Sequence, residues 1–369
     1  MSESRIHDPI RVGIIGLGYW GPKLARNFHG LDGTCTVAMA ADLRQERFAD
    51  LKELCPDAVV TNDYRDLLNG ALDAVVIATP VSTHYRLAKE ALLAGKHVLV
   101  EKPMAGNAIQ GEELVAIAKK NNLRLMVGHT FLYNPAVETV RRVILAGELG
   151  EIYYLNATRV NLGLLQPDIN VMWDLAPHDL SIFNFILDQD PIKVSAIGGV
   201  YINKSGGLPE VVYVTLRYRN DLIANLRVSW LDPVKIRRLT VVGSKKMLVY
   251  DDISEHKVML YDKGVHVSPF WVNEAEYHAP YGNWPGPDRR RKRRLNEAEF
   301  HASYRNGPDS KVTVEWSEPL RAECQHFINS IRNGSAPRSD GENGLKIVKI
   351  LESAQRSLVN GGLELAIEY

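Results

Sequence analysis

Short apolar runs and amphipathic stretches alternate along the first third of the chain. Apolar runs typical of buried strands cover residues 11–16, 36–41, 73–78, 97–100 and 124–127, and helical periodicity lies at 22–30, 84–94 and 108–121. Strands separated by helices of this length predict βαβ units, in which the strands are parallel and the connections right-handed. We therefore predict a parallel α/β domain over residues 1–127.

The pattern changes after residue 128. A helix is predicted at 134–147, and β-rich segments follow at 151–160, 193–202, 211–219, 222–231, 237–242 and 246–250. Asn220-Asp221 and Gly243-Ser244 have the composition of the tight turns that join antiparallel strands. Two helical stretches, 318–333 and 342–360, come last. We predict that residues 128–369 form an α+β domain with a large, mostly antiparallel sheet.

Composition narrows the class of protein. The 369 residues are 45% hydrophobic and 24% charged, a balance typical of soluble globular proteins. The formal net charge is zero, so neither nucleic acid nor an anionic membrane is expected as a partner. The three cysteines are scattered without disulfide or zinc spacing, so no metal is expected and a cytoplasmic location is favoured. We expect neither a secretion signal nor a membrane span, because no apolar run approaches about 18 residues.

A glycine-rich turn follows the first predicted strand. Residues 16–21 read G-L-G-Y-W-G, which matches the G-x-G-x-x-G spacing of dinucleotide-binding turns. Gly16 permits the tight turn, Gly18 lets the backbone approach a pyrophosphate, and Gly21 lets the next helix pack closely. That helix directs its N-terminal N–H groups at the phosphates, and Tyr19 and Trp20 are further candidate contacts. A glycine turn in a non-binding domain is the alternative, but the flanking strand and helix favour a Rossmann dinucleotide-binding domain.

The end of the second predicted strand bears on the choice of cofactor. Asp42 lies about 20 residues beyond the glycine turn, where a carboxylate accepts hydrogen bonds from the adenosine ribose and repels a 2′-phosphate. This favours NAD over NADP, with Leu43 as a neighbouring contact. Arg44 leaves the alternative open, because it could pair with a 2′-phosphate or simply lie at the surface.

A lysine follows the strand at 97–100. Glu101-Lys102-Pro103 stands at the carboxyl end of a parallel strand, where open α/β sheets hold their ligands. Lys102 there could hydrogen-bond a substrate hydroxyl and stabilise its alkoxide, while Pro103 restricts the backbone. A solvent-exposed charged turn is the alternative.

A second candidate group lies in W-D-L-A-P-H-D-L-S, residues 173–181. Asp174 and His178 are four residues apart, so they share one face of a helix, and we expect Pro177 in its first turn. His178 could transfer a proton near neutral pH, and a nearby carboxylate could fix its tautomer. The alternatives are that Asp174 is an N-cap and that His178 is a polar residue at a helix start.

The motifs taken together resemble one family. G-L-G-Y-W-G (16–21), A-T-P-V-S-T-H (78–84), E-K-P (101–103) and D-L-A-P-H (174–178) are similar to those of the glucose–fructose oxidoreductase/inositol dehydrogenase family, Gfo/Idh/MocA. The resemblance covers nearly the whole chain. It implies hydride transfer between a sugar or polyol carbinol and a nicotinamide, in a dimer or tetramer built on the C-terminal sheet.

The resemblance also implies roles for individual residues. Lys102 would hold the reacting oxygen, His178 would accept the proton during oxidation, and Asp174 would orient the histidine. The cofactor-lining loop corresponds to Thr79, Pro80, Ser82 and His84, and the dipeptide beside the nicotinamide ribose to Glu101 and Lys102.

Finer features indicate a branch of the family. R-V-N-L-G (159–163) and E-P-L-R-A-E-C-Q-H-F (318–327) resemble enzymes that oxidise UDP-N-acetylglucosamine-type sugars at C3. His129, Tyr133, Arg159 and Asn161 are then candidate substrate-pocket residues, with buried or sheet-face structural roles as the alternatives.

Other functions stay open from the sequence alone. A keto-sugar reductase would use the same residues in the opposite direction. A free-sugar or inositol dehydrogenase would lack a nucleotide subsite, and a non-catalytic dinucleotide sensor should have lost Lys102 or His178. Residues 277–295 suggest a long surface loop, and the cations at 289–294 within it could meet a diphosphate, a neighbouring subunit or solvent.

Overall fold

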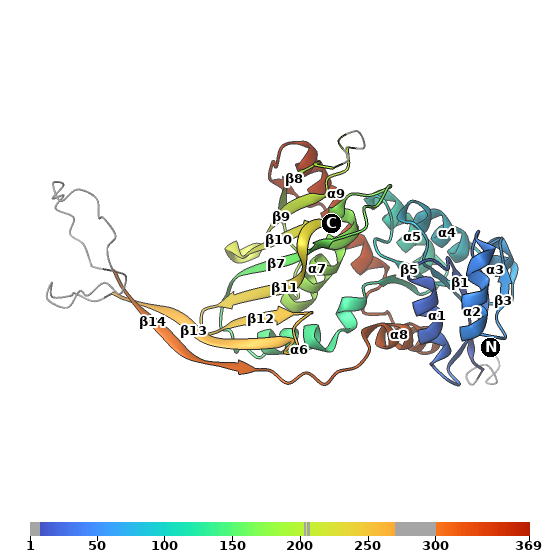
Figure 1. The fold of residues 1–369 in the computed structure, drawn as a ribbon, viewed down its shortest axis with the longest axis horizontal. Helices are drawn as coiled ribbons and strands as arrows, with labels where there is room; N and C mark the ends of the chain where they lie inside the picture. Colours follow the sequence, from blue (N-terminus) through green and yellow to red (C-terminus); the bar gives the residue numbers. More distant parts are fainter. Residues whose placement is uncertain (1–7, 203, 205–206, 270–299) are drawn as a thin grey trace.

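A computed structural model describes residues 8–202, 204, 207–269 and 300–369. Its described part contains two β-sheets that stand side by side with helices between and around them (Figure 1). The predicted basic loop at 277–295, with its cations at 289–294, lies entirely outside the described residues. Among the described residues, no helix is long and apolar enough to cross a membrane.

The first sheet is parallel and has six strands in the order β3-β2-β1-β4-β5-β6. The strands are β1 (Ile10–Ile15), β2 (Cys35–Ala41), β3 (Val59–Thr61), β4 (Ala74–Ile77), β5 (His97–Glu101) and β6 (Leu125–Gly128). This is the doubly wound order of a dinucleotide-binding fold, which confirms the predicted class. The three-residue β3 was not predicted, because so short a run gives no clear periodicity.

Helices cover both faces of this sheet. They are α1 (Gly21–His29), α2 (Phe48–Leu54), α3 (Arg65–Asn69), α4 (Val81–Leu93), α5 (Ala108–Lys120) and α8 (Pro319–Asn333). Although α8 comes late in the chain, it packs against α1, and the rings of Phe28 and Phe327 lie 6.4 Å apart at this contact. Both rings are fully buried in one apolar cluster with strand residues of the sheet.

The second sheet has nine strands in the order β14-β13-β12-β11-β7-β10-β9-β8-β15. They are β7 (Ile152–Leu162), β8 (Lys193–Gly199), β9 (Val211–Arg217), β10 (Ile223–Ser229), β11 (Leu231–Gly243), β12 (Met247–Asp251), β13 (Val258–Pro269), β14 (Phe300–Lys311) and β15 (Leu365–Ala366). Neighbouring strands are antiparallel except β7 and β10, which are parallel. The predicted mostly antiparallel sheet is therefore confirmed.

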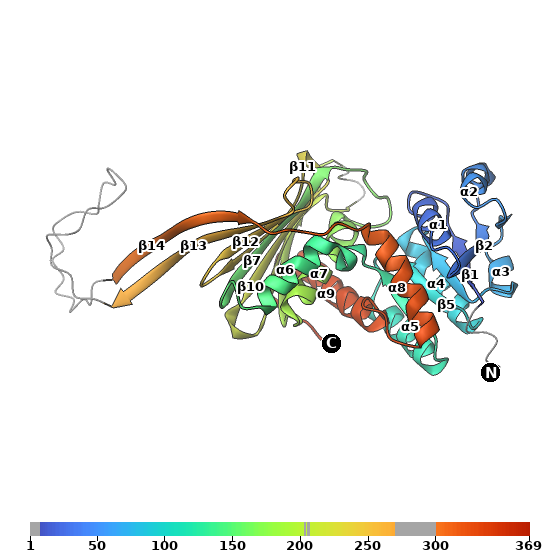
Figure 2. The same cartoon turned by 90° about the horizontal axis from the view of Figure 1, so that it is seen from below.

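One face of the second sheet is covered and the other is open. The helices α6 (Pro135–Leu145), α7 (Val171–Leu187) and α9 (Gly341–Val359) lie on one side of it (Figure 2). On the opposite side, Tyr154, Ile197 and Tyr213 from three strands are about half exposed. The ribbon of β13 and β14 extends beyond the rest of the sheet.

The start of α7 differs from the prediction. The side chain of Asn170 caps this helix by accepting hydrogen bonds from the N–H groups of Met172 and Trp173. Asp174 is therefore not the N-cap, and Pro177 lies inside the helix rather than in its first turn. Pro177 has no N–H to donate to the preceding turn, and its ring disturbs that turn.

Candidate active site

The glycine turn has the tight backbone that a dinucleotide requires. Gly16 has φ of +95°, and a Cβ there would lie 2.6 Å from the carbonyl oxygen of Ala78. A Cβ at Gly21 would lie 2.0 Å from the carbonyl oxygen of Gly16, so the helix can approach the strand only with glycine here. Nothing lies closer than 3.7 Å to a Cβ position at Gly18, which leaves its backbone open to a ligand. The residues present therefore fit a pyrophosphate.

Asp42 ties the second strand to this turn. One carboxylate oxygen accepts from the Leu17 N–H at 2.7 Å, and the other accepts from the backbone and side chain of Arg44 at 2.9 and 3.1 Å. Burial opposes ionisation, but these hydrogen bonds outweigh it and lower the pKa of Asp42. Two other predicted cofactor contacts are exposed to solvent: the exposed fraction is 74% for Tyr19 and 88% for Leu43. Arg44 thus binds the carboxylate that the sequence predicts at the ribose.

The predicted cofactor-lining residues after β4 differ in their exposure to solvent. Thr79, Pro80 and Ser82 lie at the start of α4, where they can contact a ligand. His84, predicted to contact the cofactor, is 1% exposed instead. Its ring nitrogens lie 2.8 Å from the carbonyl oxygen of Thr79 and 2.9 Å from that of Pro103. His84 therefore joins the two loops that border the site.

Lys102 reaches across to α7. Its Nζ donates to the backbone carbonyl of Asp174 at 2.6 Å and to the Asp174 carboxylate at 3.1 Å. The other carboxylate oxygen accepts from Nε1 of Trp230 at 3.1 Å. The carbonyl that meets Lys102 belongs to the helical turn that Pro177 disturbs. The Asp174 carboxylate thus binds Lys102 and Trp230, and Nδ1 of His178 accepts no hydrogen bond from and donates none to it.

His178 lies in an apolar and cationic surrounding. Its ring stands edge-to-face against Phe131 at 5.0 Å, and its Nδ1 is buried with no hydrogen-bond partner among the described residues. Burial lowers the pKa of His178 well below 6.5, and the nearby Lys102, Arg159 and Arg237 cations act in the same direction. The ring is therefore neutral at neutral pH, the state in which it can accept a proton.

Glu101 is closely packed at the edge of the site. It is 6% exposed, and burial raises its pKa to about 7. A Cβ added at Gly128 would lie 3.1 to 3.2 Å from the Glu101 carboxyl atoms, so this glycine makes room for the carboxyl group. A second buried carboxyl, Glu323 on α8, accepts a hydrogen bond from Thr130 at 2.7 Å. Burial, helped by Glu101, raises the pKa of Glu323 well above 4.5.

Two of the four predicted pocket residues, His129 and Arg159, lie close enough to His178 to influence its pKa, although neither lines the catalytic cavity described below. Both ring nitrogens of His129 are buried without a hydrogen-bond partner in the described part of the chain, and burial lowers its pKa to about 3. Arg159 is 3% exposed and binds Asp179 through contacts of 2.5 and 3.2 Å. Its guanidinium lies 4.4 Å from the centre of the Phe131 ring, which links it to His178.

Tyr133 and Asn161 lie elsewhere. Tyr133 is 4% exposed and packs against His326 and beneath Arg338, with its hydroxyl 3.4 Å from Ser339. The side chain is part of an apolar cluster, and it does not line the cavity described next. Asn161 is half-buried beside Gly163 and likewise does not line it.

A cavity of about 320 Å³, which we call the catalytic cavity, opens near the starts of α1 and α8. Glu101 and His178 line it together with residues in and just before α1, between the end of β6 and the start of α6, in β11, just after β12, and around the start of α8: Trp20, Lys23, Arg26, Gly128, Thr130, Phe131, Asn134, Arg237, Asp252, Trp316, Glu318, Pro319 and Leu320. The glycine turn, Glu101 and His178 therefore meet at one site. Among the described residues, no group of three His, Cys, Asp or Glu side chains could hold a metal ion.

Several members of this site escaped the sequence analysis. Phe131 and Trp316 lie just outside the predicted elements, whereas Trp230 and Glu323 lie within predicted elements and were not given a role at the site. The pairing of strands and the docking of α8 bring these four side chains to or near the cavity.

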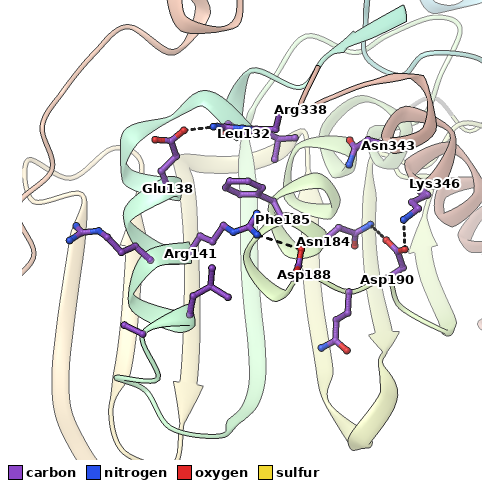
Figure 3. A pocket seen from close by; sticks show the side chains of 14 residues that line it. Leu132, Glu138, Arg141, Asn184, Phe185, Asp188, Asp190, Arg338, Asn343 and Lys346 are labelled. Carbon is purple, nitrogen blue, oxygen red and sulfur yellow. Dashed lines mark hydrogen bonds and ion pairs between the residues drawn. The ribbon is translucent and has the colours of Figure 1, made fainter. Parts of the chain in front are cut away.

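A larger cavity of about 930 Å³ lies between the ends of α6, α7 and α9 (Figure 3). Its charged side chains bind one another: Arg141 pairs with Asp188, Arg338 with Glu138, and Lys346 with Asp190. No residue of the glycine turn, of E-K-P or of D-L-A-P-H lines it. The motifs therefore favour the smaller cavity as the active site.

Comparison with known proteins agrees with this geometry. Residues 10–129 match the oxidoreductase family with the NAD-binding Rossmann fold, and residues 137–249 match the GFO/IDH/MocA C-terminal domain. The chain therefore belongs to the Gfo/Idh/MocA family of oxidoreductases, enzymes that act on CH–OH groups of sugars and related alcohols.

Individual relatives differ in their substrates. The chain is 30% identical to UDP-N-acetylglucosamine 3-dehydrogenase of Acidithiobacillus ferrooxidans over 92% of this chain and 94% of the relative. It is 25% identical to myo-inositol 2-dehydrogenase of Thermotoga maritima over 69% of this chain and 79% of the relative. The structure of the WlbA dehydrogenase from Bordetella pertussis with NADH and UDP-GlcNAcA shares the fold, with a TM-score of 0.76 and 18% identity over 98% and 99% of the two chains.

Proposed function

We propose that the chain is an NAD-dependent dehydrogenase that oxidises a secondary alcohol, at C3 of a UDP-N-acetylglucosamine-type nucleotide sugar. The main supporting observation is that Glu101 and His178 line one cavity beside the dinucleotide turn, and that Lys102, which directly follows Glu101, is close enough to His178 to lower its pKa. Similarity over nearly the whole chain to UDP-N-acetylglucosamine 3-dehydrogenase supports the substrate class.

In this proposal, Lys102, His178 and Asp174 have different roles in the oxidation of the substrate hydroxyl. The nicotinamide, when bound, supplies the hydride acceptor. Lys102, held by Asp174, donates a hydrogen bond to the substrate oxygen and stabilises the negative charge that develops there. His178, neutral because it is buried, takes the hydroxyl proton. Asp174 positions Lys102 rather than His178, and Trp230 in turn holds Asp174.

We propose NAD rather than NADP as the cofactor. The Asp42 carboxylate is ionised and already engages Arg44, so a 2′-phosphate would meet a negative charge while its potential partner is occupied. Asp42→Ser should release Arg44 and raise the ratio of kcat/KM for NADP over NAD by about tenfold or more, as loss of one charge repulsion of about 1.4 kcal/mol implies. An unchanged ratio would show that Asp42 lies away from the ribose.

We also propose a cytoplasmic homo-oligomer, a dimer or tetramer, formed through the open face of the nine-stranded sheet. Exposed Tyr154, Ile197 and Tyr213 give this face an apolar character that a second copy could cover. Light scattering during size-exclusion chromatography tests the assembly, and a monomeric mass would contradict it. The described cysteines are unpaired and buried, as in a reducing compartment.

The function is tested by following NADH absorbance while protein and NAD⁺ meet UDP-N-acetylglucosamine, its uronic acid, dTDP-glucose, free hexoses and inositols. A rise with a nucleotide sugar, lost in His178→Ala while NAD binding persists, is the expected result. A rise only with inositols would support the inositol dehydrogenase alternative, which the Thermotoga maritima relative favours. Turnover only with a keto sugar and NADH would favour the reductase, and NAD binding without turnover in either direction would favour the sensor.

A further inference from the structure

A second cavity adjoins the catalytic cavity through one side chain. Trp316 lines both the catalytic cavity and a neighbouring cavity of about 400 Å³. It stands in the irregular segment 312–318, between the end of β14 and the start of α8, and it is 60% exposed. An indole this exposed, in a segment without regular structure, contributes little to the core. Its side chain instead forms part of the wall of both cavities.

The neighbouring cavity combines cations with this aromatic side chain. It is lined by Glu255, His256, Lys257, Lys311, Val312, Thr313, Val314 and Trp316. Lys257 lies 5.9 Å from the centre of the Trp316 ring and donates to the carbonyl oxygen of Asp252 at 2.6 Å. Lys311 forms no ion pair with a described residue, and Glu255 is the sole carboxylate among the described lining residues. Two lysines and one carboxylate leave the cavity with an excess of positive charge.

Further cations continue along the catalytic cavity. Lys23 has no ion pair with a described residue and lies over the Tyr19 ring at 3.4 Å. Arg237 pairs with Asp252 at 3.2 Å. Both cations line the catalytic cavity together with His178 and Trp316, and the carboxylates of Glu101, Asp252 and Glu318 line it as well. Each cavity is at the scale of known ligand sites, so together they can hold a ligand longer than one sugar ring.

We infer that the cavity behind Trp316 is the nucleoside diphosphate subsite, with Trp316 stacking on the base and Lys257 and Lys311 facing the phosphates. This inference rests on the proposed function for the sugar end of the ligand. Stacking on an aromatic face suits a planar base, and paired lysines suit a diphosphate as point charges. A free hexose or an inositol carries neither group and would leave this cavity unused.

Binding of UDP alone tests the subsite separately from catalysis. Calorimetric titration of UDP is run with saturating NAD⁺, so that the dinucleotide turn is occupied. Trp316→Ala should raise the Kd for UDP by about tenfold or more, the scale of one lost base stack, and Trp316→Phe should restore much of the affinity. Lys311→Ala should weaken binding further and reduce its salt dependence. Tyr304→Ala, at another exposed aromatic side chain outside both cavities, is the matched control.

Kinetics then separate the two proposals. If UDP-N-acetylglucosamine is oxidised, Trp316→Ala should raise its KM by a similar factor with little change in kcat. Oxidation with an unchanged KM, or failure of UDP to bind, would overturn the subsite and leave the proposed function standing. UDP binding that weakens in Trp316→Ala without oxidation of any nucleotide sugar would support the subsite and overturn the proposed function. Equal binding of UDP by Trp316→Ala and the parent protein would overturn the subsite outright.

Discussion

The contact between Lys102 and Asp174 leads to a prediction that distinguishes two possible roles of Asp174. If Asp174 positions Lys102, Asp174→Asn should slow the reaction without altering the titration of His178. If Asp174 instead orients and stabilises the histidinium, the same change should shift that titration. The substitution keeps the size of the side chain and removes its charge.

The size of the effect follows from the hydrogen bonds. The Lys102 ammonium lies 3.1 Å from the carboxylate, and both side chains are largely buried. A hydrogen bond to a charged group contributes about 1.5 to 3 kcal/mol, so kcat/KM should fall by about 10- to 150-fold. The single amide oxygen of asparagine can accept from Lys102 or from Trp230 but does not replace both carboxylate oxygens. Asp174 is absent from the main influences on the pKa of His178, which are burial and the neighbouring cations.

The assay is the pH dependence of kcat/KM for oxidation, measured with the parent protein and with Asp174→Asn. We expect a lower plateau and an acid limb at the same pH. Asp188→Asn, at the exposed C-cap of the same helix, serves as the control and should leave both unchanged. An acid limb displaced by a full pH unit, with the plateau nearly preserved, would refute the assignment of Asp174 to Lys102.

Three further predictions use buried groups. His178 must be neutral to accept a proton, and its pKa is lowered. In the parent protein, kcat/KM for oxidation should therefore stay constant as the pH falls to 6.5 and should decline only below that pH. An acid limb above pH 6.5 would contradict this. Gly128→Ala should displace the Glu101 carboxyl group and reduce kcat/KM by about tenfold, and unchanged kinetics would show that the carboxyl group adapts freely. Arg159→Met leaves Asp179 buried without its partner, so urea denaturation should show that the free energy of unfolding falls by about 3 to 5 kcal/mol. A fall of less than about 1 kcal/mol would argue against a buried ion pair.

The sequence was most informative where function depends on the local backbone. The spacing of Gly16 and Gly21 reports a turn whose geometry excludes a side chain at either position, so the motif and the structure agree. The same holds for Lys102, because it directly follows a strand whose apolar run is easily recognised. In both cases the determining contacts lie within a few residues of the motif.

The sequence was least informative where partners meet through strand pairing and helix docking. Asp174 is 72 residues from Lys102 and 56 from Trp230, and nothing in the local pattern specifies either pair. The role given to Asp174 came from its spacing to His178 on one helix, which brings the two onto one face but does not decide which neighbour the carboxylate binds. Tyr133 is a related case, since its proximity in sequence to the site does not fix the direction of its side chain, which is buried away from the catalytic cavity.

The docking of α8 on α1 also has a consequence for the order in which the protein can fold during its synthesis. The ring of Phe327 completes an apolar cluster whose other members include Phe28 near the opposite end of the chain. We propose residues 1–127 as the dinucleotide-binding domain, yet the apolar cluster on one face of that domain stays incomplete until the ribosome has released α8. Nascent chains fold from the N-terminus as they are made, so this apolar face would be open to chaperones for most of translation. A binding-competent dinucleotide domain is therefore expected to form late, almost together with the complete enzyme.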